Sequence, residues 1–151
     1  MDIQFKYSAI KIDRFATFDA PETAASEAVT FSGEVQTGNN YDARTIMITV
    51  LSNLKMGDQL VAIIKVSSYF EIGAASWDAL KEDSVVIIPK EFLYHIGGLA
   101  VSTTCGIFFD KTEGTDLSRY ILPIIYMEDV IRSDMKIPVP EQPSTAITAS
   151  K

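Results

Sequence analysis

The fold is decided by the stretch IPKEFLYHIGGLAVSTTCGIFF, residues 88–109 of a 151-residue chain. Pro89 suits the first turn of a helix, because its missing N–H has no intrahelical partner there. A polar stretch, DKTEGTDLSRY, and an apolar one, ILPIIYMEDVI, carry the chain on to residue 131. The stretch therefore predicts a long helix followed by an apolar connection.

Apolar residues on this helix fall into two stripes, which indicates cover on two sides. A glycine inside a helix costs about 1 kcal/mol relative to alanine, and close approach of another backbone would explain the two adjacent glycines. We expect a second copy of the chain to pack there, with an interface formed by Phe92, Ile96, Gly97, Gly98 and Val101. Tight packing inside one chain is the alternative.

Four β-patterned segments precede the helix: residues 3–18, 29–37, 44–54 and 59–72. Apolar residues alternate with polar ones in them, as in half-buried strands. Gly57-Asp58 indicates a hairpin turn, and a phase slip near Ser8-Ala9 indicates a β-bulge. The pattern predicts an α+β fold, in which a four-stranded antiparallel sheet has one long helix packed on it.

We assign residues 1–134 to one domain, which is long enough to bury a core. The remaining stretch, MKIPVPEQPSTAITASK, contains three prolines and little to bury. Residues 135–151 are therefore predicted to be a Pro-rich, disordered tail.

Composition excludes several classes of partner. The net charge is -7, whereas nucleic-acid binding needs clustered Lys and Arg. The apolar runs are judged shorter than the roughly 20 residues of a membrane helix, and the amino terminus lacks the pattern of a signal peptide. Cys105 is the only cysteine. We expect a cytoplasmic protein with no bound metal.

The sequence shows no residue pattern that is typical of an active site. His95 and Cys105 are ten residues apart, which on a helix is about 15 Å and roughly 280° around the axis, so their side chains cannot meet. The acidic residues are scattered, and no phosphate loop, G-x-S-x-G elbow or H-E-x-x-H helix occurs. We predict no enzyme activity and no cofactor. A pocket for a small apolar ligand, or an enzyme of unrecognised type, is a third alternative.

Aromatic residues gather around the end of the fourth strand and after the helix. Such rings can hold apolar polypeptide segments with little demand on their sequence. The predicted client-binding residues are Tyr69, Phe70, Trp77, Phe108, Phe109 and Tyr120. A plain core filled by the same residues is the alternative, and we expect about half of them to belong to it.

The order of these parts resembles the SecB family of export chaperones. LVAIIKVSSYFEI resembles that family's fourth strand, and residues 88–109 resemble its proline-started main helix, with Gly106 in the place of the family's glycine. The sequence around Pro123 resembles its apolar-proline-apolar stretch after the helix. The connection KTEGTDLSRY is longer than in the family, and no final helix is evident.

The resemblance implies an ATP-independent holding chaperone for unfolded or precursor polypeptides, with a link to protein export. It implies a homotetramer built as a dimer of dimers. Clients would lie in apolar grooves between the sheet and the loop after the helix. The alternative function is a dedicated module for one protein partner, such as a chaperone associated with a toxin–antitoxin pair.

Overall fold

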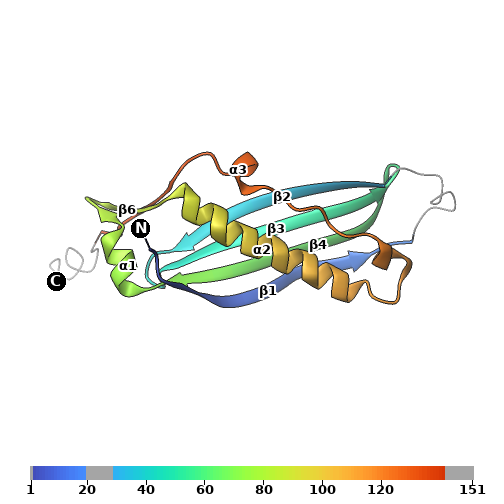
Figure 1. Ribbon diagram of the computed structural model, residues 1–151, viewed down its shortest axis with the longest axis horizontal. Coiled ribbons are helices and arrows are strands. Elements are labelled where there is room, and N and C mark those ends of the chain that lie inside the picture. Colours follow the sequence, from blue (N-terminus) through green and yellow to red (C-terminus); the bar gives the residue numbers. More distant parts are fainter. Residues whose placement is uncertain (1, 20–28, 142–151) are drawn as a thin grey trace, which may run out of the picture.

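The computed structural model describes residues 2–19 and 29–141. Four long strands form an antiparallel sheet in the order β1-β4-β3-β2, and the helix α2 runs along one face of it (Figure 1). The strands are β1 (Phe5–Thr17), β2 (Val29–Asn40), β3 (Thr45–Met56) and β4 (Gln59–Ile72). The predicted α+β fold is confirmed.

The two central strands supply most of the core. Ile46 of β3 lies opposite Phe70 of β4, and Val50 lies opposite Val66; all four are buried beneath α2. The edge strand β1 changes register between Tyr7 and Ala9, which confirms the bulge expected from the phase slip. Since α2 covers only one side, we call the other side of the sheet its open face.

The helix α2 spans Lys90–Lys111 and begins directly after Pro89, which has extended backbone angles. The N–H of Lys90 donates a hydrogen bond of 2.9 Å to Oδ1 of Asp134, a residue 44 positions later. A carboxylate in this position satisfies a helix N–H that has no intrahelical partner, typically worth about 1 kcal/mol. The helix start is thus fixed by the chain that follows it.

By length and composition, α2 would suffice to cross a membrane, so the expectation that every apolar run falls short of that length is wrong for this helix. Part of its apolar surface packs within the chain. The buried residues are Phe92, Leu93, Ile96, Gly97, Ala100, Val101, Thr104 and Phe108.

The two helix glycines have different surroundings. A Cβ atom at Gly97 would lie 2.7 Å from Cγ of Met127 in the same chain, whereas a Cβ at Gly98 would have no heavy atom within 4 Å. The close approach at Gly97 therefore comes from a side chain of the same chain and not from another backbone. Packing within one chain, the alternative considered for this glycine, accounts for it.

These surroundings predict opposite effects for two alanine substitutions. Gly97→Ala is expected to lower the free energy of unfolding by up to about 2 kcal/mol, because overpacking outweighs the gain in helix propensity. Gly98→Ala is expected to raise it by up to about 1 kcal/mol. Urea unfolding at one protein concentration measures both. A loss of stability in Gly98→Ala would instead place a second copy of the chain against that glycine.

A second, smaller sheet lies beyond the short helix α1 (Ala74–Ala79). Its strands are β5 (Lys81–Glu82), β6 (Val85–Ile88) and β7 (Met135–Pro138), in the order β5-β6-β7. The predicted tail, residues 135–151, therefore starts too early, because Met135–Pro138 pairs with β6 and buries Ile137. Proline is tolerated there because β7 is an edge strand. Residues 142–151 of that tail lie outside the described residues.

Candidate functional site

The chain returns over the sheet after α2. A 3-10 turn, η2 (Asp116–Arg119), and a single helical turn, α3 (Met127–Val130), enclose residues 120–126, which we call the connecting segment. Leu122 and Met127 are buried, and Ile125 packs over Gly33 of β2, where a Cβ atom would lie 2.8 Å from Cδ1 of Ile125. The connecting segment is thus held against the sheet by its inward side chains.

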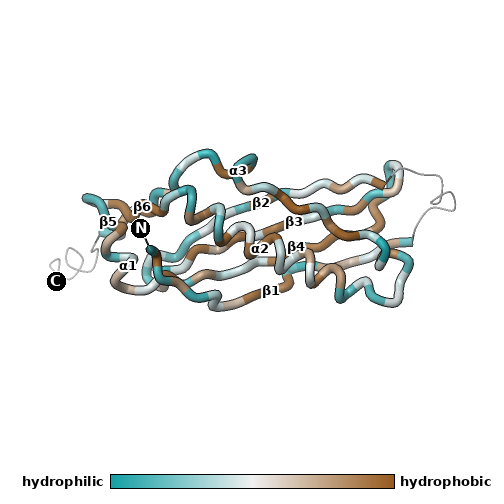
Figure 2. The backbone as a smooth tube through the Cα atoms, viewed as in Figure 1, coloured by the Kyte–Doolittle hydropathy of each residue, from teal (hydrophilic) through white to brown (hydrophobic). Residues whose placement is uncertain are grey.

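Its outward side chains are large and apolar. Ile121, Ile124 and Tyr126 keep 71%, 67% and 64% of their surface exposed. Figure 2 shows the hydrophobic colouring of this stretch where it crosses the sheet between η2 and α3. A contiguous set of exposed apolar side chains commonly marks a site of interaction with another macromolecule, so the connecting segment is the candidate functional site.

Three of the six predicted client-binding residues are core residues. Phe70, Trp77 and Phe108 are 0%, 2% and 1% exposed. The Phe70 ring lies 4.5 Å from that of Tyr7, between centroids, and the Trp77 ring lies 5.7 Å from that of Tyr41. These three side chains pack inside the chain. They belong to the core, as the alternative interpretation expected for about half of the six residues.

The other three retain exposed surface but do not form one cluster with a shared face. Phe109 is 57% exposed near the end of α2. Tyr120 is half-buried at the start of the connecting segment and packs against the core near Phe108. Tyr69 is half-buried on β4, on the side opposite Phe70, and therefore lies on the open face. Only Tyr120 belongs to the connecting segment.

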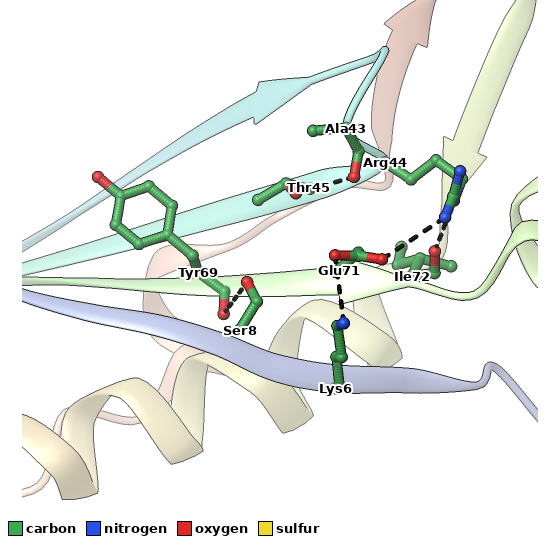
Figure 3. Close-up of polar contacts among 8 residues, drawn as sticks. All are labelled: Lys6, Ser8, Ala43, Arg44, Thr45, Tyr69, Glu71 and Ile72. Atoms are coloured by element: carbon green, nitrogen blue, oxygen red, sulfur yellow. Dashed lines mark hydrogen bonds and ion pairs between the residues drawn. The ribbon is translucent and has the colours of Figure 1, made fainter.

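Tyr69 lies in a polar setting on the open face (Figure 3). Its carbonyl oxygen accepts a hydrogen bond of 3.1 Å from Ser8 Oγ. Nearby, Glu71 is paired with Lys6 at 3.7 Å and with Arg44 at 3.5 Å, and Arg44 Nε also donates to the carbonyl of Ile72. Surface ion pairs of this kind contribute about 0–1 kcal/mol each, so they make the open face polar and add little to the stability of the fold.

The space beside Tyr69 is a hollow of about 430 Å³ lined by Ser8, Ala9, Gly38, Asn39, Asn40, Ala43, Thr45, Met47 and Tyr69. On this face, Ala9 of β1 is the cross-strand neighbour of Tyr69, Tyr69 is that of Met47, and Met47 is that of Gly38 on β2. The small side chains at the two outer positions leave the depression. It is separated from the connecting segment by the full thickness of the sheet.

Inward side chains of the connecting segment, Leu122 and Ile125, pack into the predicted groove between the sheet and the loop after the helix. A hollow of about 280 Å³ remains further along, beside α3, lined by Val35, Thr37, Leu93, Val130, Ile131, Arg132, Ser133, Asp134 and Met135. None of the six predicted aromatic residues lines it. Val130, which is partly exposed, joins this hollow to the connecting segment.

The predicted oligomer interface also divides by burial. Phe92, Ile96, Gly97 and Val101 are buried within the chain, where the sheet and Met127 cover them. Gly98 is partly exposed with open space beside it. Of the five predicted interface residues, Gly98 is thus the one with room for a second copy of the chain.

The two residues considered for catalysis lie in unrelated surroundings. The exposed His95 ring stands 5.7 Å from that of Phe5, beside a surface hollow that Asp2 and Glu91 also line. Cys105 Sγ donates a hydrogen bond of 3.7 Å to the carbonyl of Leu122, and burial raises the pKa of the Cys105 thiol, which makes it a poor nucleophile. Among residues 2–19 and 29–141, no cluster of three metal-ligating side chains occurs.

Ile121, Ile124 and Tyr126 were not among the predicted site residues. The signal for them was the unbroken run ILPIIYM. An extended chain directs successive side chains to opposite sides, so a run that is apolar at nearly every position cannot bury all of them against one sheet.

Comparison with known proteins gives a structural match and no sequence match. No family model and no curated protein matches the chain. Among solved structures, the chain is similar to the Mycobacterium tuberculosis Rv1957 SecB-like chaperone, in complex with a ChAD peptide from the Rv1956 HigA1 antitoxin. The TM-score is 0.52 at 12% sequence identity, over 80% of this chain and 90% of the other. This chain therefore has the SecB-like fold, and the resemblance seen in the sequence is confirmed at the level of the fold.

Proposed function

We propose that this protein is a holding chaperone that binds unfolded polypeptides without ATP and delays their aggregation. The observation that carries the proposal is the connecting segment, which presents three large apolar side chains on a backbone fixed to the sheet. An unfolded polypeptide exposes apolar side chains to water. Burying apolar surface on both partners lowers the free energy of the complex by roughly 25 cal/mol per Å².

Charge supports the same function. Between residues 110 and 134 there are six carboxylates, Asp110, Glu113, Asp116, Glu128, Asp129 and Asp134, against three basic residues, Lys111, Arg119 and Arg132. All nine are exposed. The excess of negative charge keeps an apolar surface soluble and attracts polypeptides that carry basic residues.

A dedicated role toward one partner is the second candidate. The structurally similar mycobacterial chaperone is bound to a peptide from an antitoxin, which favours a polypeptide ligand and leaves room for a single physiological client. Affinity capture separates the two candidates, because a holding chaperone retains many unfolded chains, whereas a dedicated module retains one dominant protein. Export of clients remains part of the first proposal.

We further propose a cytoplasmic homotetramer built as a dimer of dimers, as the SecB resemblance implies. The outward side of α2 beside the half-buried Leu99 is available for one of its contacts. Light scattering should give a mass near four times 16.6 kDa. A monomer at micromolar concentration would contradict this assembly.

The proposed activity is tested with a reduced, unfolded client. Light scattering of the aggregating client should fall progressively and level off near stoichiometric amounts of this protein, with and without ATP. Serum albumin at equal mass is the control for non-specific crowding. Unchanged aggregation at every ratio would contradict the chaperone function.

A further inference from the structure

The backbone of the connecting segment is extended at both ends and largely unpaired between them. Its first and last residues have extended angles, with φ -101° and ψ 126° at Tyr120 and φ -82° and ψ 120° at Tyr126. Between them the chain belongs to no helix or strand. Within the described residues, none of the backbone N–H groups of Ile121, Leu122, Ile124 and Ile125 donates a hydrogen bond to another backbone group. These donors remain available to water or to a ligand.

This unpaired backbone is nevertheless fixed in place. Leu122 is buried and its carbonyl accepts from Cys105 Sγ on α2, while Ile125 packs over Gly33 of β2. A ligand that binds here does not have to order a mobile loop, so the conformational entropy of this side of the contact is already lost on folding.

The side chains match the backbone. Inward side chains anchor the segment, and the outward Ile121, Ile124 and Tyr126 present a row of apolar groups. Exposed carboxylates lie before and after the row, at Asp116 and at Glu128 and Asp129, and no ion pair of theirs occurs within the described residues. An extended peptide with an apolar centre and basic flanks is complementary to this arrangement in shape and charge.

We propose that the connecting segment binds its polypeptides by strand addition. The peptide lies extended beside residues 120–126, exchanges backbone hydrogen bonds with the free groups, and packs apolar side chains on Ile121, Ile124 and Tyr126. Strand addition derives affinity from the main chain and selects side chains at alternate positions. Pro123 has no N–H, so the pairing is interrupted there. This inference rests on the proposed function and specifies how its ligand is recognised.

The test uses three synthetic peptides of one sequence, with alternating leucine and threonine between terminal lysines. One is unmodified, and the other two carry N-methyl groups on the odd-numbered or on the even-numbered amides. Because one edge of an extended peptide presents every second N–H, methylation of one set should weaken binding to the full-length protein at least tenfold. Methylation of the other set should change the affinity less than threefold. Fluorescence anisotropy of labelled peptides measures the dissociation constants.

The outcomes separate the two proposals. If the unmodified peptide binds and both methylated peptides bind equally well, or are weakened equally, strand addition is wrong and the chaperone function stands. If no peptide binds at millimolar concentration, both fail. As an independent readout, amide hydrogen exchange of Ile121, Ile124 and Ile125 is followed by NMR. Saturating unmodified peptide should slow exchange at least tenfold in at least one of them, and unchanged exchange in all three would also overturn strand addition.

Discussion

Replacing Phe70 with alanine is expected to lower the free energy of unfolding by about 3–5 kcal/mol, the usual range for removing a buried phenylalanine. Phe70 has no exposed surface, and its ring lies 4.5 Å from that of Tyr7 and 6.2 Å from that of Phe5, between centroids. Denaturant unfolding at fixed protein concentration measures the change, since any assembly would make stability depend on concentration.

The neighbouring Tyr69 provides a matched control. It is on the same strand but on the open face and is half-buried, so Tyr69→Ala should change stability by about 1 kcal/mol. If Phe70→Ala had the stability of the unmodified protein and instead lost client protection, Phe70 would be a client contact, as the sequence had predicted.

Replacing Ile121, Ile124 and Tyr126 together with serine is expected to weaken client binding about 100-fold while leaving stability nearly unchanged. If each side chain contributes about 1 kcal/mol through partial burial against a client, the three contribute about 3 kcal/mol, and each 1.4 kcal/mol corresponds to a factor of ten. Their exposure in the free chain means that little packing is lost. The concentration that halves client aggregation measures the effect.

A matched control removes exposed apolar surface elsewhere. Ile10 and Ile12 on the edge strand β1 are also exposed, and their replacement with serine should leave client protection within about twofold, because they lie on a different part of the surface. Equal losses of client protection in both variants would mean that clients bind non-specifically to any exposed apolar surface, and not to the connecting segment.

The sheet and the main helix were predictable because each rests on a local periodicity. The alternation in β4 and the hairpin at Gly57-Asp58 are read directly from neighbouring residues, and the helix begins where Pro89 permits it. The predicted strand at 59–72 has the observed bounds. Such signals need no knowledge of which other segment covers them.

The division of the aromatic residues between core and surface was not predictable in the same way. Alternation places Phe70 on the apolar face of the fourth strand and Tyr69 on the mixed face, but it does not show which aromatic rings other segments cover. The sequence predicts a loop or a short helical turn around Trp77, but it does not show that this turn, α1, packs Trp77 against Tyr41 from the turn between β2 and β3. Whether a ring is buried depends on how the sheet and helices pack together, which local sequence patterns do not specify. For this reason the sequence analysis assigned the core residues Phe70, Trp77 and Phe108 to client binding.

β7 was missed for a related reason. Met135 and Ile137 alternate with polar or proline neighbours, but a four-residue strand is a weak signal, and Pro138 and Pro140 indicate a chain that does not pair. The partner, β6, lies almost fifty residues earlier. Pairing over that separation cannot be inferred from the residues near either strand.

The pairing of β7 with β6, together with the hydrogen bond from Lys90 to Asp134, fixes the far end of the stretch that follows α2. That stretch leaves one end of a helix about 33 Å long and is fastened again at the other end. Lifting it from the sheet would require the small sheet to separate or the buried anchors to leave the core. Within the described residues, this stretch is therefore not a hinged cover, and the proposed clients would bind along its outer side without a movement of the protein.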